Sequence, residues 1–335
     1  MKILSFGEIM VRLTPPNYLL LEQCGQLNME FVGTGVNILS ALARFGYKTS
    51  IFSAVPENNL GKAAKANIRK LGINDDFIYF NGNHMGSFFV ELGYGNRPTE
   101  VTYQNRINSS FCMNDFSEYN FENVIKDIDI VHICGINLSL TQTTRNSAIK
   151  LAEIAHKHDK TVAFDFNYRP SLNTQTTTTK MREYYQEILQ YSDIVFGSQR
   201  DITDLLGIQA DETLSPRDKL EKLCREFVDT YKIKIFTGTI RTKGKDEKIA
   251  GFAFRNNILT ISTAHEITIL DRIGAGDAYA SGIIHGFLQQ WETEKMVDFA
   301  TVNCVLAHAT YGDVPMLYQN QIENYIANPG ENLIR

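Results

Sequence analysis

The sequence lacks the cysteine and histidine patterns that are typical of disulfide-rich or zinc-binding proteins. Its five cysteines contain no C-x-x-C pair and their number is odd, while its seven histidines form no H-E-x-x-H motif. A disulfide framework and a histidine zinc site are therefore not favoured. The expected location is the reducing cytoplasm, where free thiols persist.

Long apolar runs and a strong excess of one charge are also missing. No run approaches the roughly 18 apolar residues of a membrane helix, and the N-terminal stretch MKILSFGEIM reaches Gly7 and Glu8 too early for a signal peptide. The net charge is −5 and the basic residues are scattered. Neither nucleic acid nor a membrane is therefore expected as a partner.

Two common nucleotide-binding motifs are absent or incomplete. No G-x-x-x-x-G-K-[ST] motif occurs, and GTGVNI begins like G-x-G-x-x-G but lacks the third glycine. The usual P-loop route to ATP is therefore excluded, and a dinucleotide-binding fold is only weakly supported.

The chain does contain alternating apolar and amphipathic segments. With 335 residues, 43% of them hydrophobic, it can bury a large core. The alternation predicts a mostly parallel α/β sheet covered by helices on both faces. No linker or repeat divides residues 1–335, so a single domain is expected. The six predicted strands are KILSFG, KTSIFSA, DIVHICG, TVAFDFN, DIVFGS and IKIFTG.

Two segments interrupt this alternation, residues 11–33 and 87–111. The second reads as a β-hairpin that turns at GYGNRP. We expect the two segments to pair into a small β-sheet lid over the carboxyl ends of the strands, where ligands of such sheets bind. A lid would exclude water from the reaction. The alternative is a plain surface hairpin.

The stretch DRIGAGDAYASG, residues 271–282, carries the chemistry. Gly274, Ala275 and Gly276 would let successive N–H groups point at one anion, just before a helix that begins at about Gly276. The positive helix end is expected to hold Asp277 in its charged form. An anion cradle beside a proton acceptor suits phosphoryl transfer to an alcohol. The alternative is a tight turn with Asp277 as the N-cap.

These residues resemble the ribokinase-like, PfkB-type carbohydrate kinase family. DRIGAGDAYASG resembles the family's carboxyl-terminal signature, and GTGVNILSALARFG at 33–46 resembles its amino-terminal signature. Within the family the nearest resemblance is to 2-keto-3-deoxygluconate kinases, and it rests on four segments. These are GEIMVRLTPP, NRPTEVTYQNRINSS, DFNYRPSL and YGDVP.

The resemblance implies a ribokinase-like fold, ATP and Mg²⁺ as cofactors, and a homodimer formed through the lid. It implies Asp277 as general base, with Gly274, Ala275 and Gly276 as the anion hole. The implied substrate-binding residues are Gly33, Asn37, Phe88, Gln104, Arg106 and Arg169, with the two arginines on a substrate carboxylate or keto group. The implied nucleotide-binding residues are Asn167, Ser198, Thr239, Arg241 and Asn303.

The sequence departs from the family pattern at a few positions. Ser198 and Asp201 stand where the family commonly has Asn-x-x-Glu, so Asp201 would act on Mg²⁺ through water. Gln104 and Phe88 stand where related kinases tend to carry tyrosine. These changes affect the expected metal organisation and sugar preference more than the kinase chemistry.

The sequence therefore predicts an ATP-dependent kinase that phosphorylates the primary hydroxyl of a sugar acid, 2-keto-3-deoxygluconate, to its 6-phosphate. One alternative is a kinase of a neutral sugar such as fructose or ribose, or of a nucleoside. A second is a non-catalytic sugar sensor of the same fold. A neutral substrate would not need the arginines, and a sensor would not need Asp277.

Overall fold

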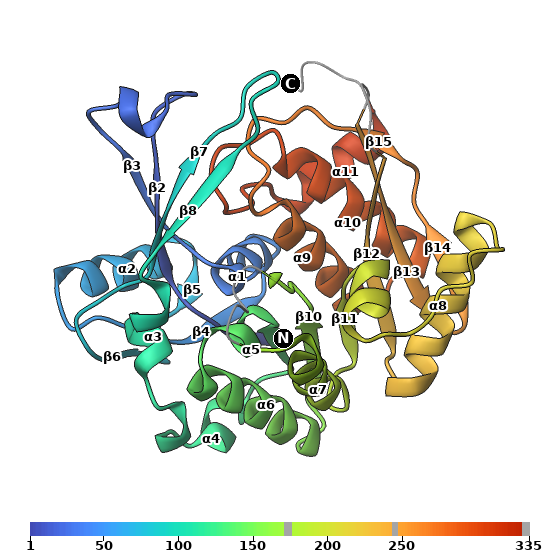
Figure 1. The fold of residues 1–335 in the computed structure, drawn as a ribbon, viewed down its shortest axis with the longest axis horizontal. Helices are drawn as coiled ribbons and strands as arrows, with labels where there is room; N and C mark the ends of the chain where they lie inside the picture. Colours follow the sequence, from blue (N-terminus) through green and yellow to red (C-terminus); the bar gives the residue numbers. More distant parts are fainter. Residues whose placement is uncertain (171–175, 243–246, 330–335) are drawn as a thin grey trace.

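The computed structural model describes residues 1–170, 176–242 and 247–329 of the chain. Its described part is a mixed α/β structure with one large sheet, flanking helices and a second, smaller sheet that rises from it (Figure 1). The chain has a ribokinase-like fold, as expected. The helices are α1 (Thr34–Arg44), α2 (Asn59–Lys70), α3 (Ser110–Met113), α4 (Phe121–Ile125), α5 (Ile136–Leu140), α6 (Gln142–Lys157), α7 (Thr178–Leu189), α8 (Pro216–Tyr231), α9 (Ala275–Leu288), α10 (Thr293–Ala307) and α11 (Gln319–Ala327).

The six strands predicted from the sequence lie side by side and run parallel. Their order is β12 (Ile235–Thr242), β11 (Ile194–Phe196), β10 (Thr161–Asp165), β9 (Ile130–Cys134), β1 (Lys2–Phe6) and β4 (Lys48–Val55). All six predictions are confirmed. Further strands that were not predicted extend the sheet at both edges: β13 (Lys248–Arg255), β14 (Ile258–Ile261) and β15 (His265–Glu266) beyond β12, and β5 (Ile73–Asn74) and β6 (Ile78–Phe80) beside β4.

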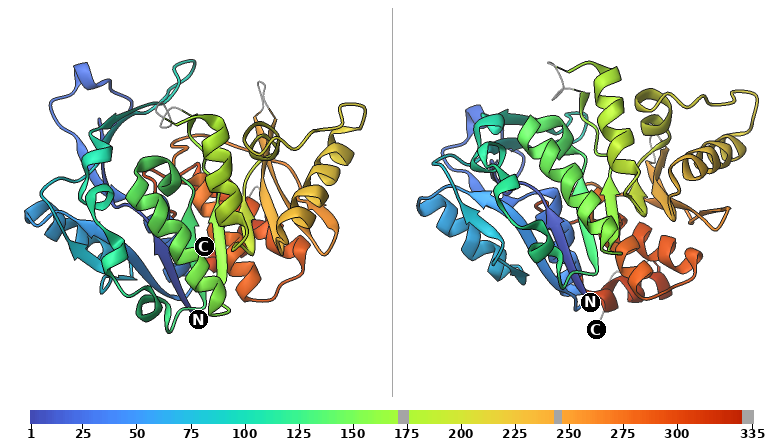
Figure 2. Two further views of the ribbon diagram at one scale, coloured as in Figure 1. Left: turned by 60° about the horizontal axis from the view of Figure 1, so that its bottom comes forward. Right: turned by 90° about the horizontal axis from the view of Figure 1, so that it is seen from below.

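The added strands beyond β12 are antiparallel, so the sheet is mixed rather than uniform. Helices cover both faces of the sheet (Figure 2), and successive strand residues pack into different cores, as Ile3 and Leu4 of β1 do. Burial on both faces explains why the central strands read as continuous apolar runs. The single-domain interpretation of residues 1–335 stays a prediction.

The two helix-poor segments pair into a four-stranded lid sheet. Its order is β3 (Asn28–Val32), β2 (Met10–Thr14), β7 (Ser87–Glu91) and β8 (Glu100–Gln104). The predicted hairpin turn is confirmed, because Tyr94 and Arg97 form a bridge around Gly95 and Asn96. The β2–β7 pair is parallel, whereas the other two pairs are antiparallel. The lid strands therefore come from both segments.

Within the described residues, no helix combines the length and the apolarity needed to cross a bilayer.

Candidate active site

The residues of the predicted anion cradle lie at the N-terminal end and first turn of α9. Gly274 is the N-cap and Ala275 the first helical residue, one position before the predicted start. The first N–H groups of a helix have no partner within it, and no side chain of the described part caps this helix. A Cβ added at the exposed Gly276 would meet no neighbouring atom within 4 Å. The turn thus offers free donors to an open space.

Gly274 is required by both its conformation and its surroundings. Its φ is 85°, a left-handed value that favours glycine. A Cβ there would lie 1.8 Å from the carbonyl oxygen of Asp313, in the loop that follows α10. The cradle is therefore pressed against a segment distant in sequence, and any larger residue would push the two apart.

Asp277 is the third residue of α9 and faces α1. Asn37 Nδ2 donates to Asp277 Oδ2 at 2.6 Å. Asn37 is buried, and its Oδ1 has no hydrogen-bond partner among the described residues. Asp277 is thus not the N-cap of its helix, because Gly274 holds that position. The site keeps an unused acceptor beside the carboxylate.

The predicted preference of Asp277 for its charged form was wrong for the protein without ligands. Burial raises the pKa of Asp277 well above its usual range, and Asp165 and Asp313 raise it further. The hydrogen bond from Asn37 and the charge of Arg169 act in the opposite direction. Desolvation and like charges outweigh the helix end here. A basic carboxylate results, which suits proton abstraction once cations are near.

Two further carboxylates lie at this end of the sheet: Asp165 acts electrostatically on Asp277, and Asp201 acts on Asp165. Burial, reinforced by the charge of Asp201, raises the pKa of Asp165 to about 7, while Arg169 opposes this. Burial also raises the pKa of Asp201, although hydrogen bonds from Ser198 lower it. Ser198 donates from both its N–H and its Oγ to Asp201 Oδ2, each at 2.7 Å. Acidic groups therefore accumulate at the ends of β10 and β11.

Arg106 is held by the carboxylate of Glu8, which follows β1. Arg106 Nε lies 2.7 Å from Glu8 Oε2, and Ser109 Oγ donates to Glu8 Oε1 at 2.6 Å. The Arg106 side chain is only 10% exposed. It is thus not a solvated surface arginine, and one of its donors is already used within the protein.

Comparison with known proteins identifies the family. Residues 1–313 match the pfkB family carbohydrate kinase. The chain belongs to this family.

Solved structures support the assignment. A candidate 2-keto-3-deoxygluconate kinase from Enterococcus faecalis is 48% identical, with 100% of this chain and 99% of that one covered and a TM-score of 0.97. The 2-dehydro-3-deoxygluconokinase of Thermotoga maritima is 29% identical, with 98% and 100% covered and a TM-score of 0.92. Among curated proteins, the 2-dehydro-3-deoxygalactonokinase of Haloferax volcanii is 23% identical over 97% of this chain and 96% of that protein. The chain is therefore a sugar kinase.

The remaining residues that were predicted to bind the substrate lie in different surroundings. Gly33 is the N-cap of α1, and a Cβ there would lie 2.3 Å from the Glu8 carbonyl oxygen. Arg169 is exposed just beyond β10, within electrostatic range of Asp165 and Asp277. The segment DFNYRPSL that suggested it ends at residues 171 and 172, which lie outside the described residues.

The two lid positions differ in exposure. Phe88 is buried in the lid core with Met10 and Val32, whereas Gln104 is exposed at the end of β8. The Phe88 ring lies 5.7 Å from that of Tyr103, centroid to centroid. Phe88 therefore shapes the lid from inside, and the free amide of Gln104 is the more accessible of the two.

The residues that were predicted to bind the nucleotide are spread over several elements. Asn167 Nδ2 donates to Cys134 Sγ at 3.3 Å, and its N–H donates to Asp165 Oδ1 at 3.2 Å. Thr239 and Arg241 lie on β12, and Arg241 Nη2 is 3.0 Å from His308 Nε2. These three residues therefore remain candidates near the ends of the strands.

Asn303 lies apart from that group. It is buried between α9 and α10, where its Nδ2 donates to Ala278 O at 2.8 Å and Ser281 Oγ at 3.2 Å. The amide group of Asn303 therefore links α10 to α9 by hydrogen bonds.

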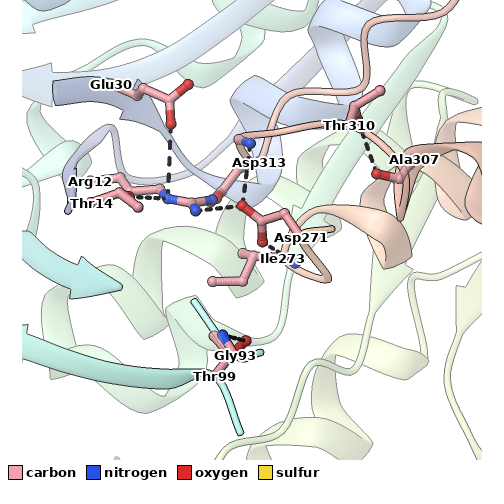
Figure 3. A network of polar contacts seen from close by, with 11 residues as sticks. Arg12, Thr14, Glu30, Gly93, Thr99, Asp271, Ile273, Ala307, Thr310 and Asp313 are labelled. Carbon is pink, nitrogen blue, oxygen red and sulfur yellow. Dashed lines mark hydrogen bonds and ion pairs between the residues drawn. The ribbon is translucent and has the colours of Figure 1, made fainter. Parts of the chain in front are cut away.

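Sequence reasoning missed a buried arginine of the kinase, Arg12 on β2. It contacts Asp271 and Asp313, and Figure 3 shows it between the lid and the loops around α9. The available signals were its place in the segment GEIMVRLTPP and its apolar neighbours Val11 and Leu13, whereas its partners lie 259 and 301 residues away.

Proposed function

We propose that this sugar kinase uses ATP to phosphorylate the primary hydroxyl of 2-keto-3-deoxygluconate, with Asp277 as the general base. The single observation that carries the proposal is the pairing of a basic, half-buried carboxylate with uncapped N–H groups in one helical turn. Asp277 would take the hydroxyl proton as the oxygen attacks phosphorus. The N–H groups of Ala275, Gly276 and Asp277 would bind the oxygens of the transferring group.

The choice of a sugar acid rests on charge. Arg169 is an exposed cation at the end of β10, where a substrate carboxylate could reach it, and guanidinium groups bind carboxylates bidentately. Arg106 has already committed its Nε to Glu8, so we assign it the support of the lid and a secondary contact. The unpartnered Oδ1 of Asn37 would accept a substrate hydroxyl. The names of the two similar solved kinases support the same substrate class.

Mg²⁺ would arrive with the phosphates of ATP. The described residues contain no group of three or more histidine, cysteine or acidic side chains that could hold a metal ion. Asp165 and Asp201 nevertheless fit a divalent cation, because each has a raised pKa that a nearby positive charge would relieve. Mg²⁺ would neutralise charge between the phosphates, and Asp201, held by Ser198, would contact it through water.

A kinase assay with a small panel of acceptors tests the proposal. The panel is 2-keto-3-deoxygluconate, its galactonate counterpart, 2-ketogluconate, fructose, ribose and adenosine, each with Mg-ATP. We expect turnover on the keto-deoxy acids and, in Asp277→Asn, loss of turnover with unchanged binding of ADP. Full activity of Asp277→Asn would refute the base assignment. Binding of a sugar without turnover would favour the sensor.

Two arginine variants distinguish a sugar-acid substrate from a neutral sugar. Arg169→Met should raise KM for the keto-deoxy acid strongly, by roughly one to two orders of magnitude if a charge-assisted bidentate contact of about 1.5–3 kcal/mol is lost. Arg225→Met, on the exposed side of α8, is the matched control. Equal KM values in the two variants, or turnover on fructose or ribose alone, would favour a neutral substrate.

The lid offers a surface for the proposed homodimer. β8 is the edge strand of the lid, and every residue in it is exposed, including Val101 at 41% and Tyr103 at 45%. An unpaired strand edge with apolar side chains favours pairing with another strand. Val101→Asp should therefore shift the sedimentation coefficient toward the monomer. A wild-type monomer at micromolar concentration would refute the dimer.

The cytoplasm is the proposed location of the kinase. Cys112, Cys134, Cys224 and Cys304 are buried free thiols, and Cys24 is partly exposed and also free. A reducing compartment keeps such thiols intact.

A further inference from the structure

Arg12 is a fully buried cation at the junction of the lid and the loops around α9. Its side chain is 1% exposed. Nη2 lies 2.5 Å from Asp271 Oδ2, Nη1 bonds Asp313 Oδ1, and Nε donates to Thr14 Oγ1 at 2.9 Å (Figure 3). All three guanidinium nitrogens are therefore directed at fixed acceptors.

The two carboxylates lie next to the anion cradle, Asp271 in the loop before it and Asp313 in the loop that packs against it. Asp271 precedes Gly274 by three residues; its Oδ1 accepts the N–H of Ile273 at 3.1 Å, and its Oδ2 accepts the N–H of Gly312 at 3.2 Å. The backbone of Asp313 in turn contacts Gly274 so closely that no Cβ fits between them. A shift of either carboxylate would therefore move the turn that carries the free N–H groups.

The same contacts reach the lid. Arg12 lies on β2, and its Nε is 3.8 Å from Oε2 of Glu30 on the neighbouring strand β3. The lid core also packs against Ile273 and Val314, on either side of the cradle. The lid strands therefore contact the loops around the cradle in two ways, through the ion pairs of Arg12 and through apolar packing on Ile273 and Val314.

We propose that Arg12 is a positioning residue that sets the geometry of the phosphate cradle, by locking Asp271 and Asp313 to the lid strand β2. The inference rests on the proposed assignment of the first turn of α9 as the cradle. A planar guanidinium with donors in fixed directions can orient two carboxylates at once, which a lysine ammonium cannot. The lid position and the cradle position are then coupled through one side chain.

A purely structural role is the competing explanation. A buried ion pair can often be replaced as a whole by apolar residues without loss, but the removal of one partner is strongly destabilising because it leaves a buried charge unpaired. If Arg12 served stability alone, its removal would lower the unfolding midpoint and leave kcat unchanged. Removal of a positioning residue would lower kcat as well, since a displacement of about 1 Å at a reacting centre costs roughly 100-fold in rate.

The test compares Arg12→Met and Arg12→Lys with Asp193→Asn, in the full-length protein. Asp193 is a matched buried carboxylate: its Oδ1 lies 2.9 Å from Lys234 Nζ and its Oδ2 accepts the N–H of Val162 at 2.9 Å, before β11 at the other end of the sheet. Each variant is assayed well below its unfolding midpoint, for kcat, for both KM values and for affinity for MgADP with aluminium fluoride and acceptor. The acceptor is whichever compound the wild-type protein phosphorylates.

We expect kcat of Arg12→Met to fall by roughly 100-fold, with small changes in KM and a parallel loss of affinity for the transition-state mimic. Arg12→Lys should lie in between. Hydrogen exchange of residues 271–277 should be faster in both variants, and unchanged in Asp193→Asn. If Arg12→Met does not fold, Asp313→Asn replaces it, with the same expected pattern at smaller size.

A lower unfolding midpoint with wild-type kcat and unchanged exchange at 271–277 would overturn the inference. That outcome leaves the base assignment intact, which Asp277→Asn tests separately. Faster exchange at 271–277 together with full activity of Asp277→Asn would instead support the link made by Arg12 and refute the proposed chemistry. The two failures are thus distinguishable.

Discussion

The carboxylates at the two ends of the central sheet differ in how far neighbouring groups compensate their charge. At the carboxyl end, Asp165 and Asp277 are surrounded by protein and by like charges, so their pKa values are raised. At the amino end, Asp129 accepts the N–H of Lys2 at 2.7 Å, and Asp193 satisfies a backbone N–H and a lysine. Unrelieved negative charge is costly. Its concentration at one end supports the proposed binding of a cation there, which would relieve this charge.

The largest effect should come from replacing the base. Asp277→Asn keeps the shape of the side chain but cannot accept the proton, so kcat should fall by about 10²–10⁴-fold. The free energy of unfolding should not fall, because a poorly compensated buried acid is removed. Kinetics with the best acceptor and urea unfolding measure the two quantities. A destabilised but active variant would contradict the comparison.

Two glycines of the cradle should respond differently to the same methyl group. Gly274→Ala places a Cβ against the Asp313 backbone at a left-handed φ, so the protein should be strongly destabilised and inactive. Gly276→Ala meets open space in a helix and should gain about 0.5–1 kcal/mol of stability.

Activity is the deciding readout for Gly276→Ala. If phosphate oxygens occupy the open space, this more stable variant should lose kcat and bind ATP more weakly. Thermal unfolding and steady-state kinetics check both glycine variants. An active Gly276→Ala would show that the cradle does not hold the transferring group.

Asp165 should make stability depend on pH. Its pKa is about 7 in the folded protein, against 3.8 for an aspartate side chain free in water, so the folded state binds the proton more tightly. Its stabilising contribution is then complete below about pH 4 and is lost as pH rises to about 7, at up to about 1.4 kcal/mol per pH unit. Asp165→Asn should lack this decline. Urea midpoints at several pH values measure it, and parallel curves for the two proteins would refute it.

The smallest effect on chemistry should come from the amino end. Asp193→Asn loses a charged hydrogen bond to Val162 and an ion pair with a largely exposed lysine, so the free energy of unfolding should fall by about 1–2 kcal/mol. The value of kcat should stay at that of the wild-type protein. A clear loss of kcat at assay temperature would mean that the two ends are not independent.

Much of the architecture was readable from local patterns. The six parallel strands are apolar runs of the right length, and the turn residues around Gly95 predicted the lid hairpin. The strands β13 and β14 were missed, although apolar and β-branched residues are present in both. The prediction of strands ended with β12. Whether a segment pairs at the edge of a sheet depends on its neighbours in space more than on its own residues.

The candidate site was predictable in its residues and not in its energetics. Asp277 and the glycines before it stood out, because free N–H groups at a helix start are a local property. The protonation preference of Asp277 came out opposite to the prediction, since its raised pKa depends first on burial in the folded protein and then on Asp165 and Asp313, which are far away in sequence. Arg106 likewise could not be seen to bind Glu8.

The sequence by itself thus determined the parallel sheet, the lid segments and the cradle with its carboxylate, because helix periodicity, strand composition and glycine conformation act over a few residues. Only the tertiary structure decided which charges meet. It buried Arg12 between Asp271 and Asp313 and raised the pKa of Asp277. Electrostatic energies depend on distance and burial in space, and no pattern along the chain carries either quantity.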